Sequence, residues 1–304
     1  MAATSTLTLL DASTAAPTTG GSIFFIGNAT VLLQVAGFTI LTDPTFIHKH
    51  EQTWLGGGLH TTRLTDPAME LADLPPLDLV LLSHFHGDHF DQVAERDLDR
   101  ALPIVTTPQS ANDLEERGFT NCLPLDVWET LSVEKGPARL RITATPARHG
   151  PPLVDFVLPD VMGSVLDVTM ADGGTSRIYI TGDTLVIDEL REIPQRFPDI
   201  DIALLHLGGT RVLGILVSMD AKQGVEAMRI VDPALAIPIH YNDYDVFTSP
   251  LSDFQEEVRA AGLEDRVHYL SHGETYTFLP RSGGSSHSGA TTAASVPPQA
   301  EAPS

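Results

Sequence analysis

Residues 83–91 read Ser-His-Phe-His-Gly-Asp-His-Phe-Asp and follow directly on an apolar run, Leu77 to Leu82. Six consecutive positions in this segment hold three histidines and a carboxylate, namely His84, His86, Asp88 and His89. In an extended segment, side chains two positions apart point the same way, so the first two histidines share one side and the last two ligands turn toward another. A solvated polar turn has no use for three histidines at this spacing, and imidazole and carboxylate groups suit Zn²⁺, Mn²⁺ or Fe. The segment therefore predicts a metal site.

Four further apolar runs lead to a residue that can bind metal. These runs and residues are Leu140–Thr145 with His149, Arg177–Ile180 with Asp183, Ile202–Leu205 with His206, and Leu235–Ile239 with His240. In layered α/β folds, side chains just past the ends of buried strands converge on one rim. We therefore expect these residues to meet the segment 83–91. Gly182 precedes Asp183 and would let the backbone turn closely beneath that carboxylate.

The candidate ligands form two complete sets. The first set is His84, His86 and His149, the second is Asp88, His89 and His240, and Asp183 lies between them. Two ions bridged in this way lie about 3.5–4 Å apart and share a hydroxide, because coordination lowers the pKa of water from about 15.7 toward roughly 7. That hydroxide is the expected nucleophile, so no serine or cysteine nucleophile is needed.

These residues resemble the metallo-β-lactamase superfamily. The segment from His84 to His89 matches its His-x-His-x-Asp-His motif, and the later ligands follow in the family's order, from about Ile23 to Phe278 of this chain. Three further segments, Gly27–Val31, Leu41–Pro44 and Ile239–Tyr241, resemble the branch that contains N-acylphosphatidylethanolamine phospholipase D and ascorbate-6-phosphate lactonase. The resemblance implies an α/β fold, the αββα four-layer sandwich, in which two mixed β-sheets are flanked by helices.

The resemblance also implies a dinuclear, metal-dependent hydrolase. We expect two divalent ions, Zn²⁺ first, with Mn or Fe left open, and cleavage of an ester, a lactone or a phosphodiester. Phospholipase-like members have a histidine near the position of Met219, and its absence from this chain favours lactonase-like chemistry. Many members of the branch also have a histidine where this chain has Asn28. Two alternatives stay open: an iron-dependent member that activates oxygen or performs redox chemistry, and a metal-binding protein without catalysis.

Two residues receive a catalytic role, Asp88 and His206. His206 stands where proline is common in the branch. One possibility is that it faces the metal pocket and protonates the leaving group or positions the substrate. The other is that it is hydrogen bonded beneath the site. Asp43 ends a strand before Pro44 and either accepts a hydrogen bond from the far nitrogen of a ligand histidine or caps a turn. Arg148 and Arg211 lie near the expected rim, where each could pair with a carboxylate or phosphate of the substrate or with an acidic residue of the chain.

Composition limits the class of protein. The chain has 304 residues, of which 42% are apolar, and we expect one hydrolase domain over 21–280. We expect a flexible N-terminal segment over 1–20, in which Leu7, Leu9 and Leu10 could add a short edge strand, and a disordered tail over 281–304 rich in Ser, Gly, Ala and Pro. A formal charge of −22 repels phosphate backbones, so we expect a small-molecule substrate and no nucleic acid. We find no signal peptide and no transmembrane segment, and therefore expect a cytoplasmic protein; a homo-oligomer is left open. The single cysteine, Cys122, is expected to serve packing.

Local patterns predict individual elements. Ser22–Ile26, Val31–Val35 and Phe38–Thr42 are typical of strands. A helix is expected to begin at Ser249 with Pro250 at its first position and to end at Gly262, and a second helix is expected over Asp220–Val231.

Overall fold

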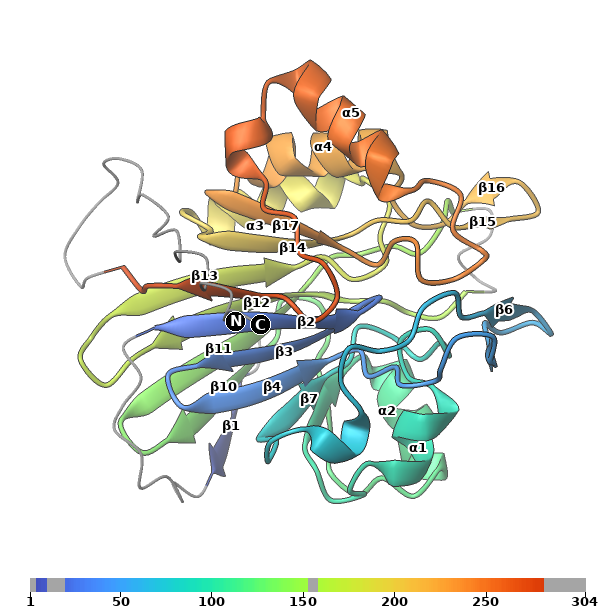
Figure 1. The fold of residues 1–304 in the computed structure, drawn as a ribbon. Coiled ribbons are helices and arrows are strands. Elements are labelled where there is room, and N and C mark those ends of the chain that lie inside the picture. Colours follow the sequence, from blue (N-terminus) through green and yellow to red (C-terminus); the bar gives the residue numbers. More distant parts are fainter. Residues whose placement is uncertain (1–3, 10–19, 153–157, 282–304) are drawn as a thin grey trace, which may run out of the picture.

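Two seven-stranded β-sheets form the centre of the fold (Figure 1). The computed structural model describes residues 4–9, 20–152 and 158–281. Strand order in the first sheet is β18 (Thr275–Phe278), β2 (Gly21–Gly27), β3 (Thr30–Val35), β4 (Phe38–Thr42), β7 (Leu79–Leu81), β8 (Ile104–Thr106) and β9 (Cys122–Pro124). Strand order in the second sheet is β1 (Thr4–Leu9), β10 (Thr130–Lys135), β11 (Ala138–Thr145), β12 (Gly163–Thr169), β13 (Thr175–Ile180), β14 (Ile202–His206) and β17 (Leu235–Ile239).

Both sheets are mixed. Strands β4, β7, β8 and β9 pair in parallel in the first sheet, as do β13, β14 and β17 in the second, while the hairpin-connected strands pair antiparallel. The parallel strands β7 and β14 are buried along their whole length, because both faces of these strands are covered. The three strands predicted between Ser22 and Thr42 are confirmed as β2, β3 and β4.

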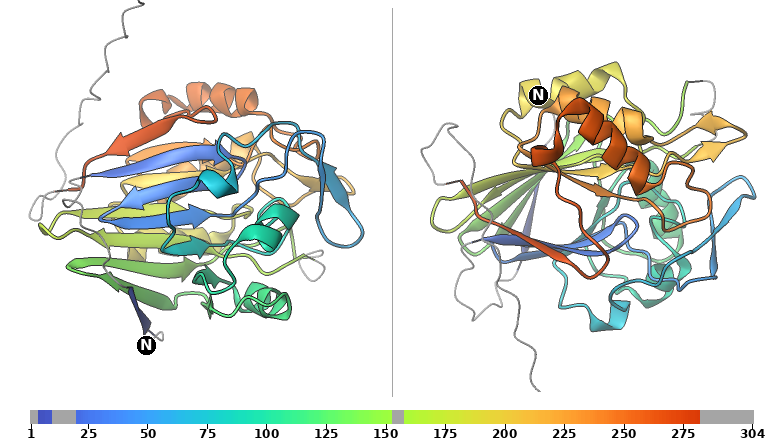
Figure 2. Two further views of the ribbon diagram at one scale, coloured as in Figure 1. Left: turned by 60° about the horizontal axis from the view of Figure 1, so that its bottom comes forward. Right: turned by 45° about the horizontal axis from the view of Figure 1, so that its top comes forward.

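Helices lie outside both sheets (Figure 2). The outer face of the first sheet packs on α1 (Gln92–Asp97), α2 (Pro108–Glu116) and the 3₁₀ turn η1 (Leu71–Asp73) through an apolar cluster that includes Phe90, Ala94 and Leu114. The second sheet packs on η3 (Asp188–Arg191), α3 (Glu192–Arg196), α4 (Ala221–Val231) and α5 (Leu251–Ala261) through Tyr179, Leu205 and Met228. The largest cluster, with Phe25, Leu33 and Ile142, lies between the two sheets. The αββα sandwich is confirmed.

The predicted helix signals are found in α4 and α5. The side chain of Asp220 caps α4 by accepting a hydrogen bond from the backbone N–H of Gln223 at 3.1 Å. Gly262 ends α5 in the left-handed region, with φ of 67°. Ser249 does not cap α5, since its hydroxyl accepts instead from the backbone N–H of Ala221 at 3.1 Å and so joins the starts of the two helices.

The described residues include only part of each chain end. Residues 4–9, placed by us in a flexible segment, form β1, which pairs in parallel with β10 at the sheet edge, as the alternative of an edge strand expected. The predicted tail lies outside the described residues except for Arg281, which bridges to Thr175. Among the described helices, none has the length and the apolar character needed to cross a bilayer.

Two short hairpins extend beyond one edge of the sandwich in all three views (Figures 1 and 2). They are β5 (Gln52–Trp54) with β6 (His60–Thr62), and β15 (Arg211–Val212) with β16 (Ile215–Leu216). Each carries exposed apolar side chains: Trp54 is 45% exposed and Leu213 is 96% exposed. The strand ends that carry the candidate ligands converge at this same edge.

Candidate metal centre

The loops that follow five strands bring the candidate residues to this edge. Residues 84–89 follow β7, His149 follows β11, Asp183 follows β13, His206 ends β14 and His240 follows β17. Strands β13, β14 and β17 run in parallel, so their carboxyl ends meet on one side of the second sheet. Every candidate ligand is at most 7% exposed. The structure thus brings all seven predicted ligands together.

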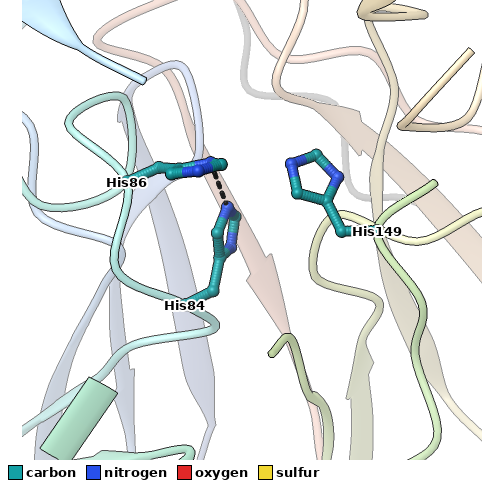
Figure 3. Close-up of side chains that lie close together, drawn as sticks. All are labelled: His84, His86 and His149. Atoms are coloured by element: carbon teal, nitrogen blue, oxygen red, sulfur yellow. Dashed lines mark hydrogen bonds between the residues drawn. The ribbon is translucent and has the colours of Figure 1, made fainter. Parts of the chain in front are cut away.

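The first predicted set forms a compact group of three rings (Figure 3). One ring nitrogen from each of His84, His86 and His149 lies within 4.8 Å of the others. The Nε2 atom of His84 lies 3.2 Å from Nδ1 of His86, and the ring of His149 is centred 5.1 Å and 5.3 Å from these two rings. Three imidazoles that converge in this way can hold one divalent ion.

The second predicted set lies beside the first. Ligand atoms of Asp88, His89 and His240 again fall within 4.8 Å of one another. Asp183 connects the two sets, because one of its oxygens groups with His84 and His89 and lies 3.6 Å from Nε2 of His89. A carboxylate in this position can bridge two ions.

Unpaired polar atoms test whether this cluster fits metal ions. Four buried atoms, Oδ1 of Asp88, Nε2 of His89, Oδ1 of Asp183 and Nε2 of His240, have no hydrogen-bond partner within the part of the chain that the structure describes. Burying such groups without a partner costs free energy, and they all belong to the predicted ligand set. Nitrogen and carboxylate donors with free lone pairs are what Zn²⁺ and related ions require, so the residues fit the group.

Hydrogen bonds on the far side of the rings orient three of the histidines. The backbone carbonyl of Val217 accepts from Nδ1 of His149 at 2.8 Å, and that of Leu207 accepts from Nδ1 of His240 at 3.1 Å. Oδ2 of Asp43 lies 3.1 Å from Nδ1 of His89. With Nδ1 protonated, each ring directs the lone pair of Nε2 toward the cluster.

Charge within the cluster separates the histidines into two groups. Burial, together with like-charge neighbours, lowers the pKa of His84 well below its usual value and that of His86 to about 3, so both rings stay neutral. Burial opposes protonation of His89 as well, yet the charges of Asp183, Asp88 and Asp43 raise its pKa well above its usual value. Burial would raise the pKa of Asp183, but His240 and His89 lower it well below its usual value. Acidic side chains thus surround His89, and a bound cation would balance their charge in place of a proton on this ring.

His206 lies in the protein interior, beside the candidate ligands. It is fully buried, and its ring is stacked on that of His89 with centroids 5.9 Å apart. Its Nε2 lies 3.2 Å from Oδ2 of Asp43, and its Nδ1 lies 3.2 Å from the hydroxyl of Thr181. Both ring nitrogens thus have partners within the protein, which is the arrangement expected of a histidine hydrogen bonded beneath the site; the alternative role at the leaving group stays a prediction.

Asp43 is the acceptor at the centre of this lower layer. Besides His89 and His206, its carboxylate accepts from the backbone N–H of Ser83 at 2.7 Å and from the Ser83 hydroxyl at 3.0 Å. Burial would raise the pKa of Asp43, but the charge of His89 and hydrogen bonds from His206 and His89 lower it to about 2. Asp43 thus takes the role of acceptor for a ligand histidine, the first of the two that its sequence position suggested.

Several contacts in this layer could not be predicted from the nearby sequence. The contacts of Val217 and Leu207 use backbone carbonyls, which every residue type has, and Ser83 and Thr181 act through tertiary contacts. Asn28 is buried with φ of 55°, and its side-chain NH₂ donates to the backbone carbonyl of Asp88 at 2.5 Å, so it braces the loop at Asp88. Met219 packs in the apolar cluster around α4.

Two residues at the cluster have a left-handed backbone conformation. Gly182 has φ of 62°, and a Cβ added there would lie 2.6 Å from the carbonyl oxygen of Met162, as its place before Asp183 suggested. His240 also adopts the left-handed region, with φ of 59°, which is unusual for a residue other than glycine. Strain of this kind persists only where surrounding contacts enforce it and is frequent at functional sites.

Comparisons with known proteins show the family of this chain. The model of the family described as "Beta-lactamase superfamily domain" matches residues 39–241, more than half of the chain. A UPF0173 metal-dependent hydrolase of Methanopyrus kandleri is 26% identical over 254 residues, covering 84% of this chain and 98% of that protein. Another from Deinococcus radiodurans is 28% identical over 237 residues, covering 74% of this chain and 95% of that protein.

A solved structure extends the comparison to the fold. The isothiocyanate hydrolase from Delia radicum gut bacteria superposes with a TM-score of 0.71 and is 25% identical, covering 85% of this chain and 99% of that one. The matched region contains every strand end that carries a candidate ligand. The chain therefore belongs to the β-lactamase superfamily domain family and has the metallo-β-lactamase fold.

Proposed function

We propose that this protein is a metal-dependent hydrolase that holds two divalent ions, Zn²⁺ first, and cleaves a carboxylic ester or a lactone. The observation that carries the proposal is the set of seven converging ligands in which four buried polar atoms are unpaired. The relatives described above are named hydrolases, which supports hydrolysis over oxygen activation.

The ligands divide the work between two ions. His84, His86 and His149 would hold the first, Asp88, His89 and His240 would hold the second, and Asp183 would reach both. The ions would supply a water of lowered pKa as nucleophile and would polarise the oxygen of the scissile group. Asp88 would bind the second ion through one carboxylate oxygen and accept a proton from the attacking water through the other, which is the catalytic role we assign to it.

The layer beneath the ligands positions them. Asp43 remains a charged acceptor and fixes the ring of His89, and His206 holds the other side of the same carboxylate oxygen. We therefore propose that His206 is a positioning residue and that it does not donate a proton to the leaving group. Its stacking on His89 restricts the movement of that ring as well.

Two features support an ester or lactone over a phosphodiester. The side chain of Met219 packs in the core, so this position offers no imidazole to a phosphate oxygen. Apolar side chains on the two hairpins, Trp54, Leu213 and Ile215, could cover an uncharged or acyl-bearing substrate at the edge where the ligands lie. An isothiocyanate is a second candidate substrate, favoured by the similarity to the isothiocyanate hydrolase.

A substrate panel with matched variants tests the proposal. Protein loaded with Zn²⁺ would be assayed against esters, lactones, phosphodiesters and an isothiocyanate, beside His86→Ala and, as control, His268→Ala, whose ring lies against Tyr276 and is not among the candidate ligands. We expect His86→Ala to bind fewer ions and to lose at least about 100-fold in activity, since changes to residues that merely support ligands already cost about 10–100-fold. Unchanged metal content and hydrolysis in His86→Ala would overturn the assignment.

A further inference from the structure

A cavity lies against one side of the candidate metal centre. Its volume is about 700 Å³, and His149 is among the residues that line it. The rest of the lining comes from the loops after β8, β9 and β11, from the segment before β12 and from η3 and α3. A cavity of this size suits a small organic molecule, and its contact with His149 places it next to the first ion position.

One part of the wall of this cavity is apolar. Its buried apolar side chains include Leu125, Val161, Met162 and Ile187, and the partly buried Trp128 adds an aromatic face. This part of the lining favours the hydrocarbon part of a ligand.

Arg148 brings a positive charge into this apolar surface. Its backbone is fixed, because its N–H donates to the hydroxyl of Thr184 at 2.9 Å and its carbonyl accepts from the N–H of Leu185 at 2.9 Å. Its side chain lines the cavity, and its Nε is buried with no hydrogen-bond partner among the described residues. By contrast, Arg211, the other arginine expected near the rim, lies 3.9 Å from Asp220. Because Nε itself is buried, an anionic oxygen of a ligand in the cavity would pair with the terminal nitrogens of this guanidinium.

The acidic side chains of the cavity limit which anion fits. Asp126, Asp160 and Glu189 are exposed members of the lining, and Glu192 is already 3.1 Å from Arg196. They repel a dianion about twice as strongly as a monoanion at the same distance, and Arg148 supplies a single positive charge. A carboxylate therefore fits better than a phosphate monoester.

We infer that this cavity binds a free carboxylate of the substrate through Arg148, with the apolar part of the substrate along the cavity wall. The inference rests on the proposed hydrolysis at the neighbouring metal centre. It narrows the substrate class to esters or lactones that carry a second, ionised carboxyl group.

A pair of chromogenic esters tests the inference. The mono-para-nitrophenyl ester of adipic acid carries a free carboxylate, and methyl para-nitrophenyl adipate is nearly the same size without the charge. The measured quantity is the ratio of kcat/KM for the free acid to kcat/KM for the methyl ester. We expect the wild type to prefer the free acid and Arg148→Gln to lose about 10- to 100-fold of this ratio, mainly through KM, which is the range for a charge-assisted hydrogen bond. Arg148→Lys should retain part of the ratio, and Arg211→Gln, with its partly exposed and already paired arginine, should leave it unchanged.

A binding measurement separates this inference from the proposed function. Calorimetry would compare phenylpropanoate with phenylpropanamide in the wild type and in Arg148→Gln, which keeps every candidate metal ligand. If phenylpropanoate binding depends on Arg148 while neither ester is hydrolysed, the carboxylate site stands and the proposed ester hydrolysis fails. If the esters are hydrolysed but Arg148→Gln alters neither the ratio nor phenylpropanoate binding, hydrolysis stands and the inference is overturned.

Discussion

The substitution Asp43→Asn tests whether the hydrogen bonds beneath the candidate metal ligands position those ligands. The carboxylate of Asp43 accepts four hydrogen bonds, from the N–H and hydroxyl of Ser83, from His89 and from His206, at distances from 2.7 to 3.2 Å. Asparagine has nearly the same shape and tolerates the left-handed backbone that Asp43 adopts with φ of 34°. The substitution therefore changes charge and hydrogen bonding with little change in packing.

The expected size of the effect follows from these contacts. If the amide oxygen keeps the N–H of Ser83, the NH₂ group takes the place of Oδ2 and faces the hydroxyl of Ser83 and the rings of His89 and His206. The hydroxyl can rotate and His206 can change its tautomer, whereas the Nδ1–H of His89 is left unpaired because Nε2 of that ring faces the cluster. An unpaired buried donor costs about 1–3 kcal/mol of folding stability. Loss of the group that orients a ligand histidine lowers metal affinity by about 10–100-fold, or roughly 1.4–2.7 kcal/mol.

The assay is a competition titration of metal-free protein with Zn²⁺ against a coloured chelator, beside thermal unfolding. Asp78→Asn is the matched control, because Asp78 is a largely buried carboxylate that pairs with Lys135 at 2.8 Å and is not among the residues of the candidate site. We expect both variants to lose stability and only Asp43→Asn to lose affinity for one of two ions. Equal Zn²⁺ affinity in the two variants would refute the positioning role of Asp43.

Three further substitutions test separate parts of the structure. His206→Gln should lower turnover by about 10-fold or less and by the same factor for esters with good and poor leaving groups; a loss that grows as the leaving group becomes poorer would mean that His206 acts as the acid. Gly182→Ala should cost about 1–3 kcal/mol more in thermal unfolding than Gly118→Ala, whose added methyl meets open space; equal losses would show that the close approach beneath Asp183 relaxes easily. Arg63→Met should cost about 3 kcal/mol in denaturant unfolding, because Arg63 is fully buried within 4.0 Å of the buried Asp243, whereas a change below about 1 kcal/mol would contradict this estimate.

Sequence reasoning could group the candidate ligands because their signal is local. A strand pattern followed by a histidine or aspartate predicts a side chain just past the end of a strand. Because parallel strands end on the same edge of a sheet, His149, Asp183 and His240 could be grouped with residues 84–89 from the sequence. The same reasoning predicted β2, β3, β4 and α4, whose periodicity and end residues lie within each element. The turn at Gly182 was predictable for the same reason.

The position of His206 could not be read in this way. Whether a histidine at the end of a buried strand points into a pocket or beneath it depends on its partner, and Asp43 is 163 positions away in the sequence. The role of Arg148 depended likewise on the absence of a partner for its Nε among the described residues, which only tertiary structure reveals. The helix cap predicted at Ser249 was wrong for a similar reason: its hydroxyl accepts from the backbone N–H of Ala221 at the start of α4 and does not cap α5.

Metal stoichiometry tests the central claim most directly. Elemental analysis after dialysis of protein loaded with Zn²⁺ would compare the wild type with Asp88→Asn, which changes the second set, and with His86→Ala, which changes the first. The account predicts two ions per chain in the wild type and close to one in each variant, with hydrolysis lost in both. A wild type that retains no ion, or variants that retain two ions and full activity, would contradict it.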